Sequence, residues 1–143
     1  MTEREETPEK NGVVFVLWDG KKIQLERRDT SDKLFFGFTI IPGGKIEKGE
    51  TPDEAMFNEV MEEYGVAVLV YKPLCDFTDI ENGGVLNKRR LYLVTKWSGV
   101  LSNPEESNGH IEATIQEAFT LCEHPLTKTF LGVAQKEISR LSA

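Results

Sequence analysis

Residues 43–66, GGKIEKGETPDEAMFNEVMEEYGV, are the most informative part of this chain. Two glycines after a proline predict a tight corner at which main-chain groups can approach a ligand. The acidic segment that follows predicts a helix in which Glu59, Glu62 and Glu63 are spaced i, i+3 and i+4. Side chains at these spacings share one helical face, so three carboxylates are expected to crowd one surface.

Carboxylates that lie this close repel one another unless a cation sits among them. Mg²⁺ prefers oxygen ligands and also binds substrate phosphates, and Mn²⁺ can substitute for it. A solvated acidic face is the alternative interpretation, and it is the commoner fate of glutamate-rich helices. The spacing of the neighbouring residues favours the metal site.

The segment from Gly44 to Val66 follows the pattern G-x5-E-x7-N-E-V-x-E-E-x-G-V. This pattern resembles the Nudix box, the signature of hydrolases that cleave nucleoside diphosphates linked to another group. The resemblance is specific over residues 43–66 and looser over residues 13–141. IQLERR at residues 23–28, followed by a loop and PGGKIE at residues 42–47, makes the chain most similar to the MutT type.

One position departs from the family pattern, because Asn58 stands where the family has arginine. In the family that arginine holds a glutamate in the geometry that metal binding and catalysis require. A short neutral amide lacks the charged planar fork of an arginine. We therefore expect the fold to be kept and the catalytic rate to be lowered, with loss of activity as the extreme.

The resemblance implies roles for individual acids. Glu59 is the first choice for catalytic base or bridging metal ligand, and Glu63 is the first choice for metal ligand. Glu62 is expected to assist in both tasks, and Glu50 to orient or complete the acidic cluster, with support of the helix N-terminus as its alternative. The resemblance also implies that the main-chain carbonyl of Gly43 is a metal ligand.

Two cations, Arg28 and Lys45, resemble positions near the substrate phosphates, where positive charge stabilises phosphoryl transfer. Solvation at the surface is the alternative for both. In this family a further acid often comes from a later loop, and three residues are candidates: Glu105, Glu106 and Glu112. Three phenylalanines could stack on a base, although aromatic residues in a strand are more often core: Phe35, Phe36 and Phe38. Two histidines have no ligand spacing and are interpreted as incidental: His110 and His124.

Length and composition are those of one globular domain, with 143 residues, 39% hydrophobic and 29% charged. The sequence has neither an apolar run of membrane-spanning length nor a signal peptide, so a cytoplasmic protein is expected. Cys75 and Cys122 lack metal-ligand spacing and are expected to be free thiols. The net charge of −7 argues against a nucleic-acid partner, whereas a small polyanion is compatible because bound divalent ions invert the local field.

Before the helix, a flexible tail is expected over residues 1–11, with the domain over residues 12–143. Strands are predicted at 13–18, 22–27 and 34–41, the first two joined by a hairpin turn at Asp19-Gly20. A capping box at Thr51 and a stop at Gly65 bound the helix, and its buried stripe is predicted to be Met56, Val60 and Tyr64.

After the helix, a strand is predicted at 67–72, which Pro73 ends or places at a sheet edge. Strands at 74–80 and 91–97 are predicted to form a hairpin, with three solvated cations in its loop: Lys88, Arg89 and Arg90. Residues 98–109 are expected to form a loop, and residues 111–119 a strand that runs into a helical turn. A closing amphipathic helix is predicted at 126–141, with an inward face made of Phe130, Val133, Ala134, Ile138 and Leu141. The resemblance implies an α/β fold, the Nudix-type α/β/α sandwich with a mixed sheet.

The leading hypothesis is a Mg²⁺-dependent pyrophosphohydrolase that cleaves a nucleoside triphosphate, oxidised ones included, to monophosphate and pyrophosphate. A second hypothesis keeps the chemistry and changes the substrate to a nucleoside diphosphate sugar or a similar conjugate. A third is a nucleotide-binding module whose catalysis is weakened or lost through Asn58. No nucleic-acid or membrane partner is expected, and homodimerisation is left open.

Overall fold

The computed structural model describes residues 9–28, 37–80, 83–102 and 109–142. Its centre is a four-stranded sheet in the order β4-β1-β6-β5. The strands are β1 (Glu9–Leu17), β4 (Gly43–Lys45), β5 (Ala67–Ile80) and β6 (Leu86–Ser98). β1 runs parallel to β6, whereas β4 and β5 pair antiparallel at the two edges, so the sheet is mixed.

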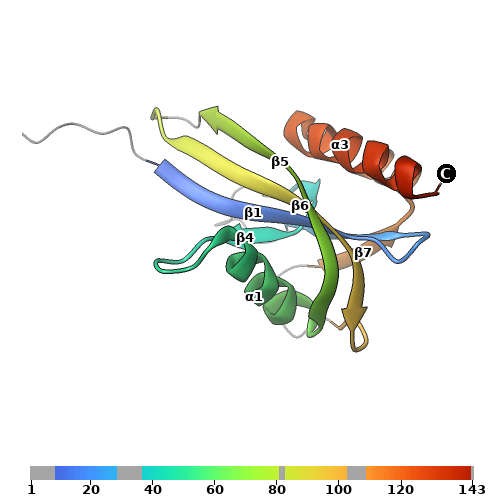
Figure 1. The fold of residues 1–143 in the computed structure, drawn as a ribbon. Coiled ribbons are helices and arrows are strands. Elements are labelled where there is room, and N and C mark those ends of the chain that lie inside the picture. The colour runs from blue at the N-terminus through green and yellow to red at the C-terminus, as the bar shows by residue number, and fades with distance from the viewer. Residues whose placement is uncertain (1–8, 29–36, 81–82, 103–108, 143) are drawn as a thin grey trace, which may run out of the picture.

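Helices cover both faces of this sheet (Figure 1), with α1 (Pro52–Tyr64) on one face and α3 (Pro125–Ser142) on the other. Two apolar clusters correspond to the two faces, because successive residues of a strand point to opposite sides. Val16 of β1 joins the cluster that includes α3, and its neighbour Phe15 joins the cluster that includes α1. The predicted α/β/α sandwich is confirmed, and so is the prediction of a central buried strand.

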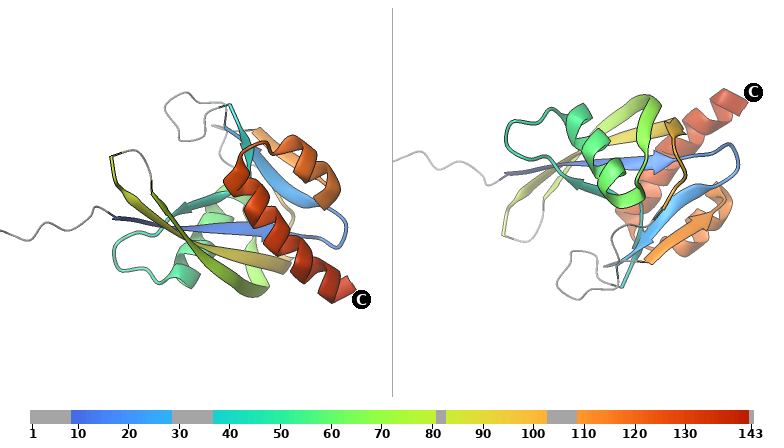
Figure 2. Two further views of the ribbon diagram at one scale, coloured as in Figure 1. Left: turned by 90° about the horizontal axis from the view of Figure 1, so that it is seen from above. Right: turned by 90° about the horizontal axis from the view of Figure 1, so that it is seen from below.

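A second sheet is antiparallel, in the order β3-β2-β7 (Figure 2). It is formed by β2 (Ile23–Arg27), β3 (Thr39–Ile40) and β7 (Gly109–Ala113), and α2 (Ile115–Leu121) follows it. The hairpin turn after β1 exists, since Asp19 accepts hydrogen bonds from the amides of the next two lysines. However, a single isolated bridge, Trp18 to Ile23, joins its two arms. β2 pairs with β7 instead, which buries Leu25 in the cluster that includes α3.

Helix α1 has the predicted bounds and both predicted caps. Thr51 Oγ1 accepts from Glu54 N at 3.1 Å, while Glu54 Oε1 accepts from Thr51 N at 2.9 Å. Gly65 ends the helix with φ of 72°, a conformation that favours glycine. The buried stripe is also confirmed, with Ala55 added to it: Met56, Val60 and Tyr64.

Two predicted boundaries are wrong because pairing partners far along the chain extend the strands. β1 begins at Glu9, inside the segment expected to be a tail, because Glu9 and the residues after it pair with the start of β6. Residues 1–8 lie outside the described part. β5 continues through Pro73 with a register shift between Pro73 and Cys75, so the strands predicted at 67–72 and 74–80 are one strand. Its place at the sheet edge confirms the second alternative for Pro73, because an edge strand tolerates proline.

The predicted hairpin of β5 and β6 is confirmed, but the three cations expected in its loop lie within β6. They are paired rather than merely solvated: Lys88 with Glu9, Arg89 with Asp79, and Arg90 with Asp76. The expected loop at 98–109 also contributes to strands, since β6 ends at Ser98 and β7 begins at Gly109.

The closing helix α3 is confirmed with one error in its inward face. Leu141 is 46% exposed, whereas the unpredicted Leu131 is fully buried. Of the strand predicted at 34–41, the described residues form only Thr39–Ile40. Within the described residues, α1, α2 and α3 are each too short or too polar to cross a membrane.

Candidate active site

Strand β4 and helix α1 meet at Gly44 and Glu59. A Cβ atom on Gly44 would lie 2.1 Å from Glu59 Cδ, so the glutamate side chain passes directly over the glycine. A Cβ on Gly43 would lie 2.2 Å from the main-chain oxygen of Val13 in β1. Neither glycine has a positive φ, so close approach rather than unusual backbone angles requires them. This corner places the Glu59 carboxylate against the main chain of β4.

Glu59 and Glu63 lie one helical turn apart, and their carboxyl groups hydrogen-bond to each other. Burial is the main cause that raises the pKa of both groups. For Glu63 the negative charge of Glu26 adds to burial and the pKa reaches about 9. In the absence of a cation, Glu63 therefore keeps a proton at neutral pH, and a metal ion would take the place of that proton.

Glu26 of β2 belongs to this cluster, although sequence reasoning missed it. It is only 4% exposed, and Arg28 Nε lies 3.6 Å from its Oε2 atom. The positive charge of Arg28 lowers the pKa of Glu63, which places Arg28 beside the cluster as well. Alternation along β2 was the available signal, because an inward Leu25 turns Glu26 to the opposite face.

Glu50 is held at the edge of the cluster by two donors. Asn58 Nδ2 donates to Glu50 Oε2 at 2.6 Å, and Glu47 N donates to Glu50 Oε1 at 2.8 Å. The amide that replaces the family arginine therefore still reaches a glutamate, although without the positive charge of an arginine. The charges of Glu62, Glu50 and Glu47 all raise the pKa of Glu59, so the corner brings them together. Glu62 is exposed to solvent. Glu47 was not predicted to belong to this cluster.

The donors at this corner suit a hard divalent cation. They are carboxylate oxygens, and Mg²⁺ and Mn²⁺ prefer oxygen ligands. Among the described residues, His, Cys, Asp and Glu side chains do not form a ready-made group of three or more metal ligands. The fit instead comes from the half-buried, hydrogen-bonded pair of Glu59 and Glu63, whose mutual repulsion when both are ionised a cation would relieve.

The remaining predicted residues lie farther out or outside the described chain. Lys45 is exposed at the end of β4. Glu112 of β7 accepts a hydrogen bond of 3.0 Å from Gln24, and it is not among the charges that shift the pKa of Glu59 or Glu63. Four candidates lie outside the described residues: Phe35, Phe36, Glu105 and Glu106. The ring centroid of Phe38 lies 5.3 Å from that of His124 in an edge-to-face contact.

Both histidines contact other parts of the fold rather than the acidic cluster. His110 stacks on the ring of Tyr64 with the ring centroids 4.4 Å apart, and burial lowers its pKa. His124 Nδ1 accepts from Leu126 N at 3.2 Å and so caps the start of α3. Neither histidine joins the acidic cluster.

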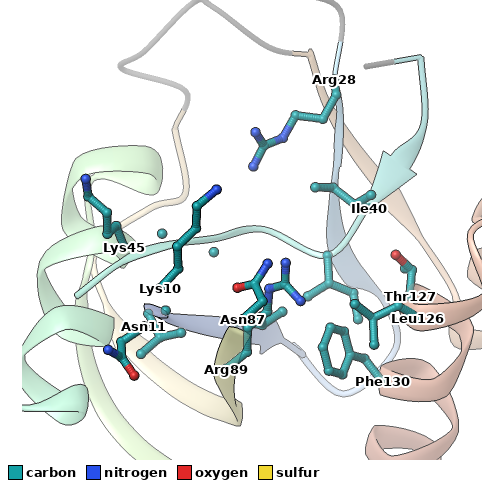
Figure 3. A pocket seen from close by; sticks show the side chains of 16 residues that line it. Lys10, Asn11, Arg28, Ile40, Lys45, Asn87, Arg89, Leu126, Thr127 and Phe130 are labelled. Carbon is teal, nitrogen blue, oxygen red and sulfur yellow. The ribbon is translucent and has the colours of Figure 1, made fainter. Parts of the chain in front are cut away.

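Gly43 and Gly44 also line a cavity of about 190 Å³, shown in Figure 3. It lies between β4, the start of β1, β6 and the first turns of α3. Arg28 lines it and also lies beside Glu63, so the cavity and the acidic cluster are neighbours. Sequence reasoning missed this cavity, because Lys10 was assigned to the tail and Arg89 to a loop.

Comparisons with known proteins identify the family of the chain. The family model described as NUDIX domain matches residues 8–133. The 8-oxo-dGTP diphosphatase of Proteus vulgaris is 32% identical over 74 residues, 50% of this chain and 62% of that protein. The 8-oxo-dGTP diphosphatase of Haemophilus influenzae is 34% identical over 76 residues, 53% of this chain and 52% of that protein. An uncharacterised Nudix hydrolase of Rhodococcus erythropolis matches over 35% of its length, so the chain spans about half the length of these curated relatives.

Solved structures share the fold. The MutT NUDIX hydrolase from Burkholderia pseudomallei superposes with a TM-score of 0.73 at 22% identity, over 87% of this chain and 96% of that one. The NUDIX domain of Shewanella oneidensis NrtR, solved with ADP ribose, has a TM-score of 0.73 at 14% identity, over 94% of this chain and 90% of that one. At these identities the likeness concerns the fold alone.

Proposed function

Because the chain belongs to the NUDIX domain family, we propose that it is a divalent-metal-dependent hydrolase of a nucleoside triphosphate, oxidised ones included. The products would be the nucleoside monophosphate and pyrophosphate. The observation that carries this proposal is the half-buried, hydrogen-bonded pair of Glu59 and Glu63 against the glycine corner. The names of two relatives, both 8-oxo-dGTP diphosphatases, support a triphosphate as the substrate.

We propose Mg²⁺, with Mn²⁺ as a substitute, as the cation of this site. The carboxylates of Glu59 and Glu63 and the carbonyl of Gly43 would hold it, with Glu62 assisting. When bound, it supplies neutralisation of the phosphate charge and a lower pKa for a nearby water.

The protein groups then act on the water and on the phosphates. Glu59 takes a proton from the water as its oxygen attacks phosphorus. The P–O bond of the diphosphate bridge breaks, and the leaving phosphate keeps the electron pair. Arg28, which lies beside Glu63, pairs with phosphate oxygens and stabilises the charge that builds up on them. Lys45, at the end of the neighbouring strand, adds positive charge at the rim.

Glu50 and Asn58 act as positioning residues in this scheme. Their hydrogen bond of 2.6 Å fixes the Glu50 carboxylate near Glu59. The bond supports a working site and so weakens the third hypothesis, in which Asn58 abolishes catalysis. A neutral amide nevertheless stabilises the carboxylate less than a charged guanidinium does.

A nucleoside diphosphate conjugate is the second candidate substrate. One structural neighbour, the NUDIX domain of NrtR, was solved in complex with ADP ribose. Conjugates and triphosphates both contain the diphosphate that the carboxylates beside Gly43 and Gly44 would bind through metal. The geometry of these carboxylates therefore does not distinguish the two classes of substrate.

A nucleotide panel tests the proposal. Canonical nucleoside triphosphates, 8-oxo-dGTP and ADP ribose are incubated with Mg²⁺, and ³¹P NMR identifies the products. Release of pyrophosphate from a triphosphate supports the first candidate, and release of two monophosphates from ADP ribose supports the second. Nucleotide binding without turnover, under Mg²⁺ or Mn²⁺, would refute both. The variant Glu59→Gln serves as the control for contaminating hydrolases.

We also propose the cytoplasm as the compartment. Cys75 and Cys122 are both unbridged, which suits a reducing environment. A net charge of −7 supports a small anionic substrate bound through metal rather than a nucleic acid. Homodimerisation stays open.

A further inference from the structure

The side chain of Tyr64, the last residue of α1, ends in a buried hydroxyl group that lacks a hydrogen-bond partner. The residue is 1% exposed, and the part of the chain that the structure describes offers this oxygen neither a donor nor an acceptor. A buried hydroxyl without a partner costs free energy, because it has given up its hydrogen bonds to water. Such a group is rare in a native fold, and a role in a functional site is one explanation for it.

The neighbouring rings fix the place of the Tyr64 ring. It stacks on the ring of His110, with centroids 4.4 Å apart and an interplanar angle of 25°, and it meets Phe15 edge-to-face at 6.3 Å. His110 of β7 lies directly opposite Glu26 of β2 in the strand register. Residues that lie directly opposite each other share one face of a sheet, so Tyr64 packs against the face that carries Glu26.

The hydroxyl of Tyr64 also lies within range of two charges of the acidic cluster. Burial is the main cause that raises the pKa of Tyr64, and the negative charges of Glu63 and Glu26 raise it further. The charge of Glu26 also raises the pKa of Glu63, so the three groups gather where α1 meets β2. The contacts of the ring and the charges that act on the hydroxyl therefore agree on its position.

Glu63 needs a new hydrogen-bond donor when it ligates a cation. Its hydrogen bond with Glu59 depends on a proton between the two carboxyl groups. A divalent cation that both carboxylates ligate takes the place of that proton, so this bond is lost. Carboxylates that ligate a metal are in turn held by hydrogen bonds from residues behind them. Tyr64 can donate such a bond without giving up another one.

We propose that Tyr64 is a positioning residue of the metal site, whose hydroxyl donates to the Glu63 carboxylate when Glu63 ligates the divalent cation. Tyr64 keeps its own proton throughout. Without the cation the hydroxyl lowers stability, and with the cation it holds a ligand in place. The inference rests on the proposed function, which supplies the cation. It adds a residue at a position that the pattern over residues 44–66 leaves unspecified.

Tyr64→Phe and Tyr92→Phe form a matched pair of variants, because each removes one hydroxyl from a fully buried ring. The Tyr92 hydroxyl donates to Asp53 Oδ1 at 2.6 Å, outside the acidic cluster. Mn²⁺ binding is measured by EPR at pH 8. Tyr64→Phe should weaken Mn²⁺ binding about tenfold, and Tyr92→Phe less than about twofold. Equal affinities of Tyr64→Phe and the unmodified protein would overturn the proposal.

Urea unfolding in EDTA provides a second readout, in which the two variants should differ in sign. Tyr64→Phe should raise the urea midpoint, because it removes an unpaired buried oxygen, whereas Tyr92→Phe should lower it, because Asp53 loses a donor. A lowered midpoint in Tyr64→Phe would mean that the hydroxyl already has a partner inside the protein. A raised midpoint with unchanged Mn²⁺ affinity would mean that the hydroxyl only lowers stability. Either result would overturn the proposal.

A double-mutant cycle with Glu63→Ala identifies the acceptor. Once Glu63 is alanine, Tyr64→Phe should change Mn²⁺ affinity less than about twofold, because the group that accepts from the hydroxyl is gone. A loss of about tenfold in both backgrounds would assign the hydroxyl to another group and overturn the proposal. Absence of Mn²⁺ binding by the unmodified protein would instead refute the proposed metal site, and this inference with it.

Discussion

Asn58 Nδ2 donates a hydrogen bond of 2.6 Å to Glu50 Oε2, at the position where the family pattern has an arginine. The second oxygen of Glu50 accepts from Glu47 N at 2.8 Å, so the carboxylate is held from two sides. The substitution thus keeps the contact and gives up the positive charge. The charge of Glu50 in turn contributes to the raised pKa of Glu59, so the hydrogen-bonded pair of Asn58 and Glu50 acts on the glutamate proposed as the catalytic base.

Restoring the charge should increase the rate. A guanidinium donor is worth about 1 kcal/mol more to a carboxylate than an amide donor, so Asn58→Arg should raise kcat roughly fivefold. Asn58→Leu, which removes the donor, should lower kcat by a similar factor. Steady-state kinetics on the best substrate of the panel measures both. If Asn58→Leu matches the unmodified protein, the hydrogen bond to Glu50 has no part in catalysis.

Removing the charge of Glu59 should nearly abolish turnover. A positioned general base contributes about 100-fold to 10,000-fold, so Glu59→Gln should reduce kcat by that factor. Glu62→Gln should cost less, because Glu62 is exposed and only assists. Glu123→Gln, an exposed change outside the site, is the control for loss of one negative charge. A Glu59→Gln variant with full activity would exclude Glu59 from the mechanism.

The two glycines of the corner should respond differently to alanine. At Gly44 the new methyl group meets the movable end of Glu59, so Gly44→Ala should stay folded and lose activity more than about tenfold. At Gly43 it meets the main chain of Val13, so Gly43→Ala should lower the free energy of unfolding by about 1–3 kcal/mol.

Urea unfolding and kcat together distinguish the two glycine variants. Gly132→Ala in α3 is the control, because nothing lies within 4 Å of the added Cβ, and it should stabilise by about 0.5–1 kcal/mol. Full activity in Gly44→Ala would show that Glu59 does not need its place over β4.

The metal-free protein should lose stability as pH rises. The pKa of Glu63 is about 9 when folded and 4.5 in its ordinary state, so between these values the folded protein holds a proton that the unfolded chain releases. The free energy of unfolding contributed by this group therefore falls from about pH 4.5 to about pH 9.

Glu63→Gln cannot ionise and should show a shallower fall over this range. Urea unfolding in EDTA at several pH values measures both proteins. The same pH dependence in the two would mean that Glu63 does not retain its proton. Because a metal ion must displace that proton, Mg²⁺ affinity should rise with pH in the unmodified protein.

Helix α1 could be predicted to the residue because its signals are local. The Thr51 capping box, the Gly65 stop and the stripe through Met56 and Val60 all lie within or next to the helix itself. Strand limits depend on partners far along the chain. Pro73 indicated either a strand end or an edge position, and only the pairing of β5 with β6 shows that the edge position is the right one.

The same distinction between local signals and long-range pairing applies to the candidate active site. Glu59 and Glu63 belong to one continuous motif, so their proximity could be predicted. Glu26 and Arg89 reach the site through β2 and β6, and their positions depend on pairing with β7 and β1. The hydrogen bond from Asn58 to Glu50 was also not predicted, because the spacing of two residues in the sequence does not give the path of the chain between them.

The most direct test of the account is Mn²⁺ binding measured by EPR, with the unmodified protein and the double variant Glu59→Gln/Glu63→Gln compared at pH 8. The account predicts that the unmodified protein removes free Mn²⁺ signal and that the double variant binds at least about tenfold more weakly. Equal binding by the two proteins, or no binding by the unmodified protein even with nucleotide present, would contradict it.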